Sequence, residues 1–102
     1  MEYIKRFNVV MCLINGHKKP ALIISPDELN DVLSHVLVAP VTDTKYRFPC
    51  RIDVQFSGKK GQIALDLIQP VSKEVIVEKM GALPPVGVTR ILDVLQAFFA
   101  RD

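Results

Sequence analysis

An Asn-Gly pair between two apolar runs constrains this chain more than any other short feature. Residues 7–14 are nearly all apolar or β-branched, Asn15-Gly16 follows, and a second run covers about 18–25. Both central residues of a type I′ turn need positive φ, which Asn and Gly tolerate best. The pattern therefore predicts a tight antiparallel hairpin, with a first strand that is buried on both faces or forms a barrel stave.

Further short strands are predicted along the chain, over residues 35–41, 50–56, 62–68 and 75–83, with a shorter strand or irregular segment after Pro70. A turn or two of helix is expected over 27–33. After Thr89, a predicted N-cap, apolar residues are spaced to give one wide helical face: Ile91, Leu92, Val94, Leu95, Phe98 and Phe99. This order predicts a mainly β protein, a small antiparallel barrel with a short helix after the second strand and a C-terminal amphipathic helix.

Length and composition fit one ordinary globular domain, expected to span 1–102. The 102 residues are 49% hydrophobic and 24% charged, which is unlike the composition of a disordered chain. No apolar run approaches the ~20 residues of a membrane span, and the opening lacks a signal-peptide pattern. We therefore expect a cytoplasmic protein with no membrane partner.

The two cysteines and two histidines show no metal-ligand spacing. Cys12 and Cys50 lie in strand-like stretches without a CxxC pair, and only His17 and His35 could join them as ligands. Reduced, structural thiols are favoured over a disulfide or a metal site. We expect no metal and no cofactor.

The charge distribution favours a local basic site over a broad basic surface. Net charge is +2, with seven Lys/Arg against five Asp/Glu in residues 1–51 and six of each in the remainder. A dedicated duplex-DNA binder usually carries a stronger basic field, because phosphate neutralisation supplies most of its affinity. Lys18 and Lys19 begin the second strand, where such charges commonly protect a sheet edge.

The segment Asp43-Thr44-Lys45-Tyr46-Arg47-Phe48 interleaves two basic and two aromatic residues. Bases stack on aromatic rings and phosphates bind cations, so such a loop can hold a single nucleic-acid strand. The alternative is a mobile connector with Phe48 in the core. Asp66, between two leucines on a predicted strand, must face solvent or a groove, or be paired, because burying a lone carboxylate is costly.

Three segments in order carry a resemblance to a known family. They are HKKPALIISP at 17–26, VLVAPVT at 36–42 and GQIALD at 61–66. The first resembles the basic-basic-Pro-Ala-apolar-Ser-Pro signature of the MazF/PemK toxins, with Asn30 at a position where members often carry Asn. The second is similar to the family's apolar strand that ends in Pro-x-Thr. With the terminal helix, the resemblance covers about 6–100.

The resemblance implies a homodimer of SH3-like barrels that acts as the toxin of a toxin–antitoxin pair and is silenced by a cognate antitoxin protein. It implies metal-independent cleavage of single-stranded RNA, such as mRNA, by attack of the 2′-hydroxyl, which leaves 2′,3′-cyclic phosphate and 5′-hydroxyl ends. The family assigns the charged role to the position of Lys19 and a supporting hydroxyl to that of Thr42. The expected RNA-binding residues are His17, Lys18, Asp43, Thr44, Lys45, Tyr46, Arg47 and Asp66.

Three departures from the family pattern keep other functions open. Lys19 replaces the usual Arg, Asn15-Gly16 replaces a long loop, and Arg6-Phe7-Asn8 replaces an Arg-Gly-Asp/Glu opening. A catalytically weak member that only binds antitoxin or nucleic acid is one alternative. A CcdB-like gyrase poison is another, disfavoured because that family acts through a Trp-containing tail and this chain has no Trp. Since adjacent strand residues face opposite ways, only one of the two lysines is expected to face the site, and the family position selects Lys19.

Overall fold

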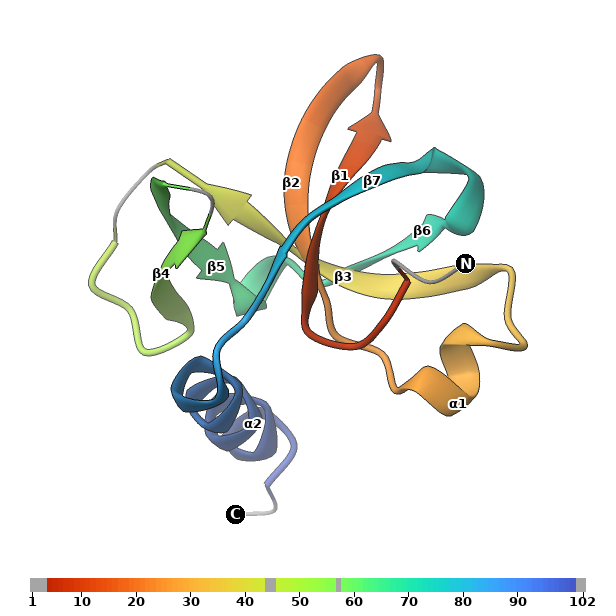
Figure 1. Ribbon diagram of the computed structural model, residues 1–102. Helices are drawn as coiled ribbons and strands as arrows, with labels where there is room; N and C mark the ends of the chain where they lie inside the picture. Colours follow the sequence, from red (N-terminus) through yellow and green to blue (C-terminus); the bar gives the residue numbers. More distant parts are fainter. Residues whose placement is uncertain (1–3, 44–45, 57, 101–102) are drawn as a thin grey trace.

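The computed structural model of the chain describes residues 4–43, 46–56 and 58–100. Short strands dominate these ranges, and the only two α-helices within them are α1 and α2 (Figure 1). In chain order the elements are β1 (Asn8–Ile14), β2 (His17–Ile23), α1 (Asp27–Asn30), β3 (His35–Thr42), β4 (Arg51–Phe56), β5 (Lys59–Ala64), the 3-10 helix Leu65–Leu67, β6 (Gln69–Ser72), the 3-10 helix Lys73–Val75, β7 (Ile76–Ala82) and α2 (Pro85–Phe98).

The predicted hairpin is confirmed and forms a long arm of the molecule (Figure 1). Asn15 and Gly16 have φ values of 53° and 79°, the positive values that a type I′ turn requires. Ile14 pairs with His17, so two residues make the turn. The pairing continues along the arm and fixes which side chains of β2 can face a neighbouring strand.

The strands form one curled antiparallel sheet, as the predicted β-barrel class requires. Its order is β4-β5-β3-β2-β1-β7, and β6 pairs with β3. Figure 1 shows that the sheet is strongly curled, with β7 beside the hairpin and with β4 and β5 near α2. Register shifts at two places between β1 and β7 accompany this curvature.

The central strands are buried on both faces, as predicted for the first of them. On β1, Val10 belongs to one apolar cluster and Val9 to another, because adjacent strand residues point to opposite faces. The first cluster is completed by residues such as Val71 and Ile76 from β6 and β7. The second lies beneath α2 and includes Ile91, which is fully buried.

The C-terminal helix is confirmed, but it begins earlier than predicted. Pro84 is the N-cap and Pro85 occupies the first helical turn, where its fixed φ suits the helix and its missing N–H costs nothing. Thr89 is therefore inside the helix, and its Oγ1 donates a hydrogen bond to the carbonyl of Pro85 (3.2 Å). No helix in the described part of the chain is long and apolar enough to cross a membrane.

A buried polar network fixes α1 against the sheet. Asn30 is 2% exposed and accepts a hydrogen bond from the Ser25 hydroxyl (2.5 Å). Its side-chain nitrogen donates to the Ser25 carbonyl (2.8 Å), and the Ser25 hydroxyl accepts from the backbone N–H of Leu37 (3.1 Å). The helix ends at Asn30, with Asp31 as its C-cap, and not at residue 33 as predicted.

The fifth strand also ends earlier than predicted. It stops at Ala64, and Leu65–Leu67 form a single 3-10 turn in which Leu65 is buried. Asp66 is therefore exposed on a turn and does not alternate with leucines on a strand. The largely apolar stretch 62–68 predicts one strand because apolar residues also occur in buried turns, so composition alone does not separate the two.

Phe7 carries a backbone conformation that normally favours glycine. Its φ is 69°, which for a bulky residue is a strained value. Its N–H donates to the Ile23 carbonyl (2.8 Å), its carbonyl accepts from Leu83 (2.9 Å), and its ring packs against the second core cluster. The Arg6 guanidinium lies 4.8 Å from the ring centroid. Packing and backbone pairing thus hold Phe7 where the related family pattern has Gly.

The positive φ of Phe7 predicts that glycine is more stable than alanine at position 7, the reverse of the usual order in a strand. Phe7→Ala and Phe7→Gly both lose the ring contacts, but only Ala keeps the Cβ penalty, so Phe7→Gly should be more stable than Phe7→Ala by about 1 kcal/mol. Urea unfolding followed by circular dichroism measures the difference. As a matched control, Leu13 on β1 has no positive φ, so Leu13→Gly should be less stable than Leu13→Ala. The same order at both positions would contradict the strain argument.

Candidate functional site

An open groove of about 830 Å³ runs along one side of the curled sheet. Its lining comes from the hairpin arm, the end of β3, the 3-10 turn after β5 and the start of β6. The charged and hydroxyl side chains among the lining residues are Lys18, Lys19, Thr42, Asp43 and Asp66. Three segments distant in sequence therefore meet at one concave surface.

Both lysines of β2 line the groove, although strand alternation predicted only one. The reason is the way β2 is paired: its pairing with β3 covers only Ala21–Ile23, whereas Lys18 and Lys19 pair with β1 alone. The other edge of β2 is thus open at these residues, and the groove runs along that edge. Side chains that leave opposite faces of an edge strand can both border such a space. Pro20, which cannot donate to a neighbouring strand, follows them on the same edge.

Thr42 lies at the end of β3, against β5. It pairs with Gln62, and Val41 pairs with Ile63. Between the strands, a Cβ added to Gly61 would lie 2.8 Å from a Val41 side-chain carbon and 3.1 Å from the Thr42 carbonyl oxygen. Gly61 therefore allows the close approach that places the end of β3 at the groove.

Asp66 lines the groove and is paired, which resolves the alternatives that its sequence position left open. The Arg51 guanidinium donates two hydrogen bonds to its carboxylate, Nε to Oδ1 at 2.7 Å and Nη2 to Oδ2 at 2.9 Å. These hydrogen bonds lower the pKa of the Asp66 carboxyl and raise the pKa of Arg51. Both groups stay charged at neutral pH, and the pair presents little net charge to the groove.

A second pocket, of about 410 Å³, is lined by residues from the segment after β3 and from the facing strands β4 and β5. Tyr46 and Phe48 stack with ring centroids 5.4 Å apart and planes within 9°. Phe48 is 54% exposed, so the alternative that placed it in the core is wrong. The Arg51 guanidinium lies 5.0 Å from the Tyr46 centroid. Arg51 thus contacts both the aromatic pair and the carboxylate at the groove.

Gln62 anchors this segment to the sheet. Its side chain is buried, its Nε2 donates to the Tyr46 carbonyl (3.0 Å) and to Asp53 Oδ1 (2.9 Å), and its Oε1 accepts from the Tyr46 N–H (2.9 Å). The amide therefore pairs with the backbone of Tyr46 as a neighbouring strand would. A buried amide with every polar atom bonded fixes its partner firmly.

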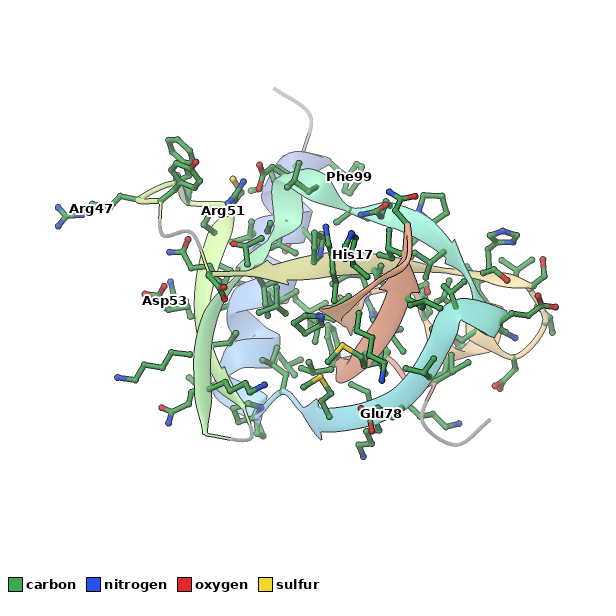
Figure 2. The ribbon with its side chains drawn as sticks, turned by 90° about the horizontal axis from the view of Figure 1, so that it is seen from above. His17, Arg47, Arg51, Asp53, Glu78 and Phe99 are labelled. Atoms are coloured by element: carbon green, nitrogen blue, oxygen red, sulfur yellow. The ribbon has the colours of Figure 1, made fainter. Side chains whose placement is uncertain are left out.

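The predicted site residues fall into three groups. Lys18, Lys19, Thr42, Asp43 and Asp66 share the groove, while Tyr46 and Arg47 line the second pocket. His17 is exposed at the start of β2 and does not line the groove. Figure 2 shows Arg47 directed outward at the end of the molecule that carries Arg51 and Asp53, well away from His17 in that view. Thr44 and Lys45 lie outside the described residues.

Thiols and histidines do not assemble into a site in the described part of the chain. Both cysteines are free, and no group of three or more metal-ligating side chains occurs there. Burial raises the pKa of Cys12 to about 11, so this thiol is protonated and unreactive at neutral pH.

Arg51 and Gln62 contact the predicted site residues, although the sequence did not single them out. Arg51 and Gln62 belong to predicted strands, where alternating polar residues normally face solvent. Their partners, Asp66 and Tyr46, are 15 and 16 residues away. No local pattern specifies such pairs, because Asp66 and Tyr46 lie outside the strands and only the tertiary fold brings them to Arg51 and Gln62.

The fold is that of several solved toxin structures. An endoribonuclease from a Mycobacterial species, in complex with its cognate antitoxin, has a TM-score of 0.86 at 22% identity, over 96% of this chain and 98% of its own. A MazE-MazF structure from Deinococcus radiodurans gives 0.83 at 19%, over 96% of both chains. The Mycobacterium tuberculosis toxin MazF-mt6 gives 0.82 at 17%, over 93% and 98%. Among curated proteins, no sequence matches this chain.

The curled sheet and the terminal helix place this chain in the same fold class as these structures. The model of the PemK-like, MazF-like toxins of type II toxin–antitoxin systems matches residues 5–99. The chain belongs to this family. The family resemblance carried by its three segments is thereby confirmed.

Proposed function

We propose that this toxin is an endoribonuclease that cleaves single-stranded RNA in the groove of Lys19 and Thr42. The observation that carries the proposal is the meeting of these two side chains, 23 positions apart, in one open groove with Lys18 at its border. Relatives of the same fold described as endoribonucleases support it at the level of the family. A cytoplasmic site of action follows from mRNA as the substrate.

The proposed reaction is a transfer within the RNA, in which the groove supplies a cation and a hydroxyl while water accepts the 2′ proton and returns a proton to the leaving oxygen. The ribose 2′-oxygen attacks the adjacent phosphorus, the bond to the 5′-oxygen breaks, the 2′ proton leaves to a base and the 5′-oxygen takes up a proton. This leaves 2′,3′-cyclic phosphate and 5′-hydroxyl ends. Negative charge grows on the phosphoryl oxygens in the transition state, and a cation fixed beside them lowers the barrier. Lys19 supplies that cation, and Thr42 supplies a supporting hydroxyl.

The preference for a single strand is supported by the shape of the site. Net charge is only +2, so the protein lacks the broad basic field of a duplex binder. The lysines line a groove, and aromatic rings stand exposed in the pocket beyond Asp66. Cations and open rings together suit an unpaired strand whose bases are accessible.

An antitoxin protein is the second proposed partner, supported by family membership and by relatives solved as toxin–antitoxin complexes. The gyrase-poison alternative is not favoured, because the chain matches the PemK-like, MazF-like model and contains no Trp. The remaining alternative is a catalytically weak toxin that only binds antitoxin or nucleic acid, because Lys19 replaces the Arg that is usual in the family. That residues 1–102 form a single toxin domain stays a prediction.

Substitution of the two lysines separates catalysis from general electrostatics. Lys19→Ala should slow cleavage by about 10²-fold or more, because it removes a cation that acts on the transition state. Lys18→Ala should mainly weaken binding and reduce the slope of log K against log salt by about 1. Lys19→Arg should hold or raise the rate, since the planar guanidinium can donate to two phosphoryl oxygens. Single-turnover cleavage of one RNA measures all three effects.

Equal folding of the lysine variants is checked by circular dichroism before the rates are compared. Equal losses for Lys18→Ala and Lys19→Ala would contradict the assignment of Lys19, because both would then act only by general attraction of phosphate.

Cleavage should not require a metal ion. No group of three metal-ligating side chains occurs in the described residues, and no step of the proposed reaction passes through a metal ion. Pure toxin incubated with a mixed-sequence single-stranded RNA should give 5′-hydroxyl fragments at the same rate with and without EDTA. Loss of cleavage in EDTA, followed by recovery with Mg²⁺ or Mn²⁺, would contradict this mechanism.

We further propose that the toxin is a homodimer, supported by the apolar side chains that α2 leaves uncovered. Phe98 is 47% and Phe99 82% exposed, although the opposite side of the helix packs on the second core cluster. Light scattering should give twice the 11.4 kDa of one chain at micromolar concentration. Phe99→Glu should shift this toward the monomer, because a carboxylate is costly to bury. Val32→Glu, on the equally exposed segment after α1, is the control; a monomeric unmodified toxin would contradict the proposal.

A further inference from the structure

We infer that Tyr46 and Phe48 form a nucleobase-stacking subsite that holds one unpaired base of the RNA beside the cleavage groove. The inference rests on the proposed function, and it adds a specific contact for a nucleotide away from the scissile phosphate. The sequence predicts that the loop of Tyr46 and Phe48 can hold a single strand, with a mobile connector as the alternative, and the arrangement of the two rings specifies the contact. The ligand is defined by chemistry: a flat aromatic base on a ribose-phosphate chain.

The first observation is the geometry of the rings. Tyr46 and Phe48 are parallel within 9° at a centroid distance of 5.4 Å, yet they remain 46% and 54% exposed. Large aromatic faces in water are normally covered by a core or a ligand. An exposed stack leaves ring surface available to a third flat group. Bases of any identity can use such a surface, because each has a π-face.

The second observation is that the stack is held in place before any ligand binds. Both backbone hydrogen-bonding groups of Tyr46 are bound to the buried amide of Gln62, at 2.9 and 3.0 Å. The Arg51 guanidinium, fixed by its two hydrogen bonds to Asp66, lies 5.0 Å from the Tyr46 ring centroid. A preformed surface loses little conformational freedom on binding, which favours affinity.

The third observation is the connection between this pocket and the groove. Gln62, which holds Tyr46, is the cross-strand partner of Thr42 in the β3–β5 pairing. Asp66 lines the groove, and its partner Arg51 lines the pocket of the rings. Two independent links therefore tie the stack to the proposed cleavage site. A strand that lies in the groove reaches the rings with a base close to the scissile bond.

The charges of the pocket favour a nucleic acid over a protein segment as the occupant. Arg47 lines it together with the rings, while Arg51 is held in the ion pair with Asp66 and Asp53 accepts a hydrogen bond from Gln62 Nε2. Figure 2 shows Arg47 extended outward from this end of the molecule. A cation beside an open ring matches the alternation of phosphate and base along a single strand. An apolar protein segment could pack against the rings, but it would offer no anionic group to the outward Arg47.

The test uses the full-length toxin and a short 2′-O-methyl RNA, which binds but cannot be cleaved through its 2′-oxygen. One 2-aminopurine is placed at each position in turn, because its fluorescence falls when the base stacks on an aromatic ring. Phe48→Leu keeps an apolar side chain without an aromatic face, and Phe48→Trp keeps the face. Arg47→Gln removes a cation and leaves both rings. Urea unfolding and circular dichroism establish that all variants are folded.

With the unmodified toxin, fluorescence should fall at one position, or at two neighbouring ones. Phe48→Leu should abolish that fall and weaken binding by about tenfold, without changing the salt slope of affinity. Phe48→Trp should retain the fall in fluorescence. Arg47→Gln should lower the salt slope by about 1 and leave the fluorescence change in place.

The subsite would be overturned if RNA bound without a fall in fluorescence at any position, or if the fall persisted in Phe48→Leu. It would also be overturned if Phe48→Leu weakened the affinity for antitoxin and left the affinity for RNA unchanged. Cleavage of the unmodified RNA is measured alongside. Quenching without cleavage would overturn the proposed enzyme and leave the subsite standing, whereas cleavage without quenching would overturn the subsite alone. A toxin that neither binds nor cleaves RNA would overturn both.

Discussion

The rest of the structure depends on the backbone pairing of β3. This strand pairs with β2 through Ala21–Ile23, with β6 through its first half and with β5 through Val41 and Thr42. β6 and β5 pair with successive stretches of β3, and the twist of these paired strands accompanies the curl of the sheet (Figure 1). The curl gives the central strands two buried faces and ends β3 at the groove. The position of Thr42 is therefore a consequence of sheet topology.

The groove is present because β2 extends beyond the residues that pair with β3. Only Ala21–Ile23 pair with β3, so the arm continues alone and its edge is open at Lys18 and Lys19. An open strand edge invites unwanted pairing, and lysines at an edge oppose it. In this toxin the same two charges are proposed to attract RNA. Edge protection and the proposed RNA binding would use the same two charges, which is why this sequence pattern fits both interpretations.

Ion pairing decides which charges of the site are available to a ligand. Asp66 would repel phosphate if it were free, but two hydrogen bonds from Arg51 engage its carboxylate. The cations of Lys18 and Lys19 are then opposed in the groove chiefly by Asp43. The same Arg51 lies against Tyr46. One ion pair therefore sets the field of the groove and supports the neighbouring rings.

The sequence by itself determined the local structure and the family: Asn15-Gly16 specified the hairpin, and three short segments carried the resemblance that the family match confirmed. It also marked Lys19 and Thr42, and it placed Thr89 and the end of the fifth strand wrongly, because caps and buried turns depend on their surroundings. Only the tertiary structure decided that Arg51 binds Asp66, that Gln62 holds Tyr46 and that both lysines border the groove. These contacts arise where the curled sheet brings strands beside turns and connecting segments that are distant in sequence, and local residue patterns do not encode which segments become neighbours.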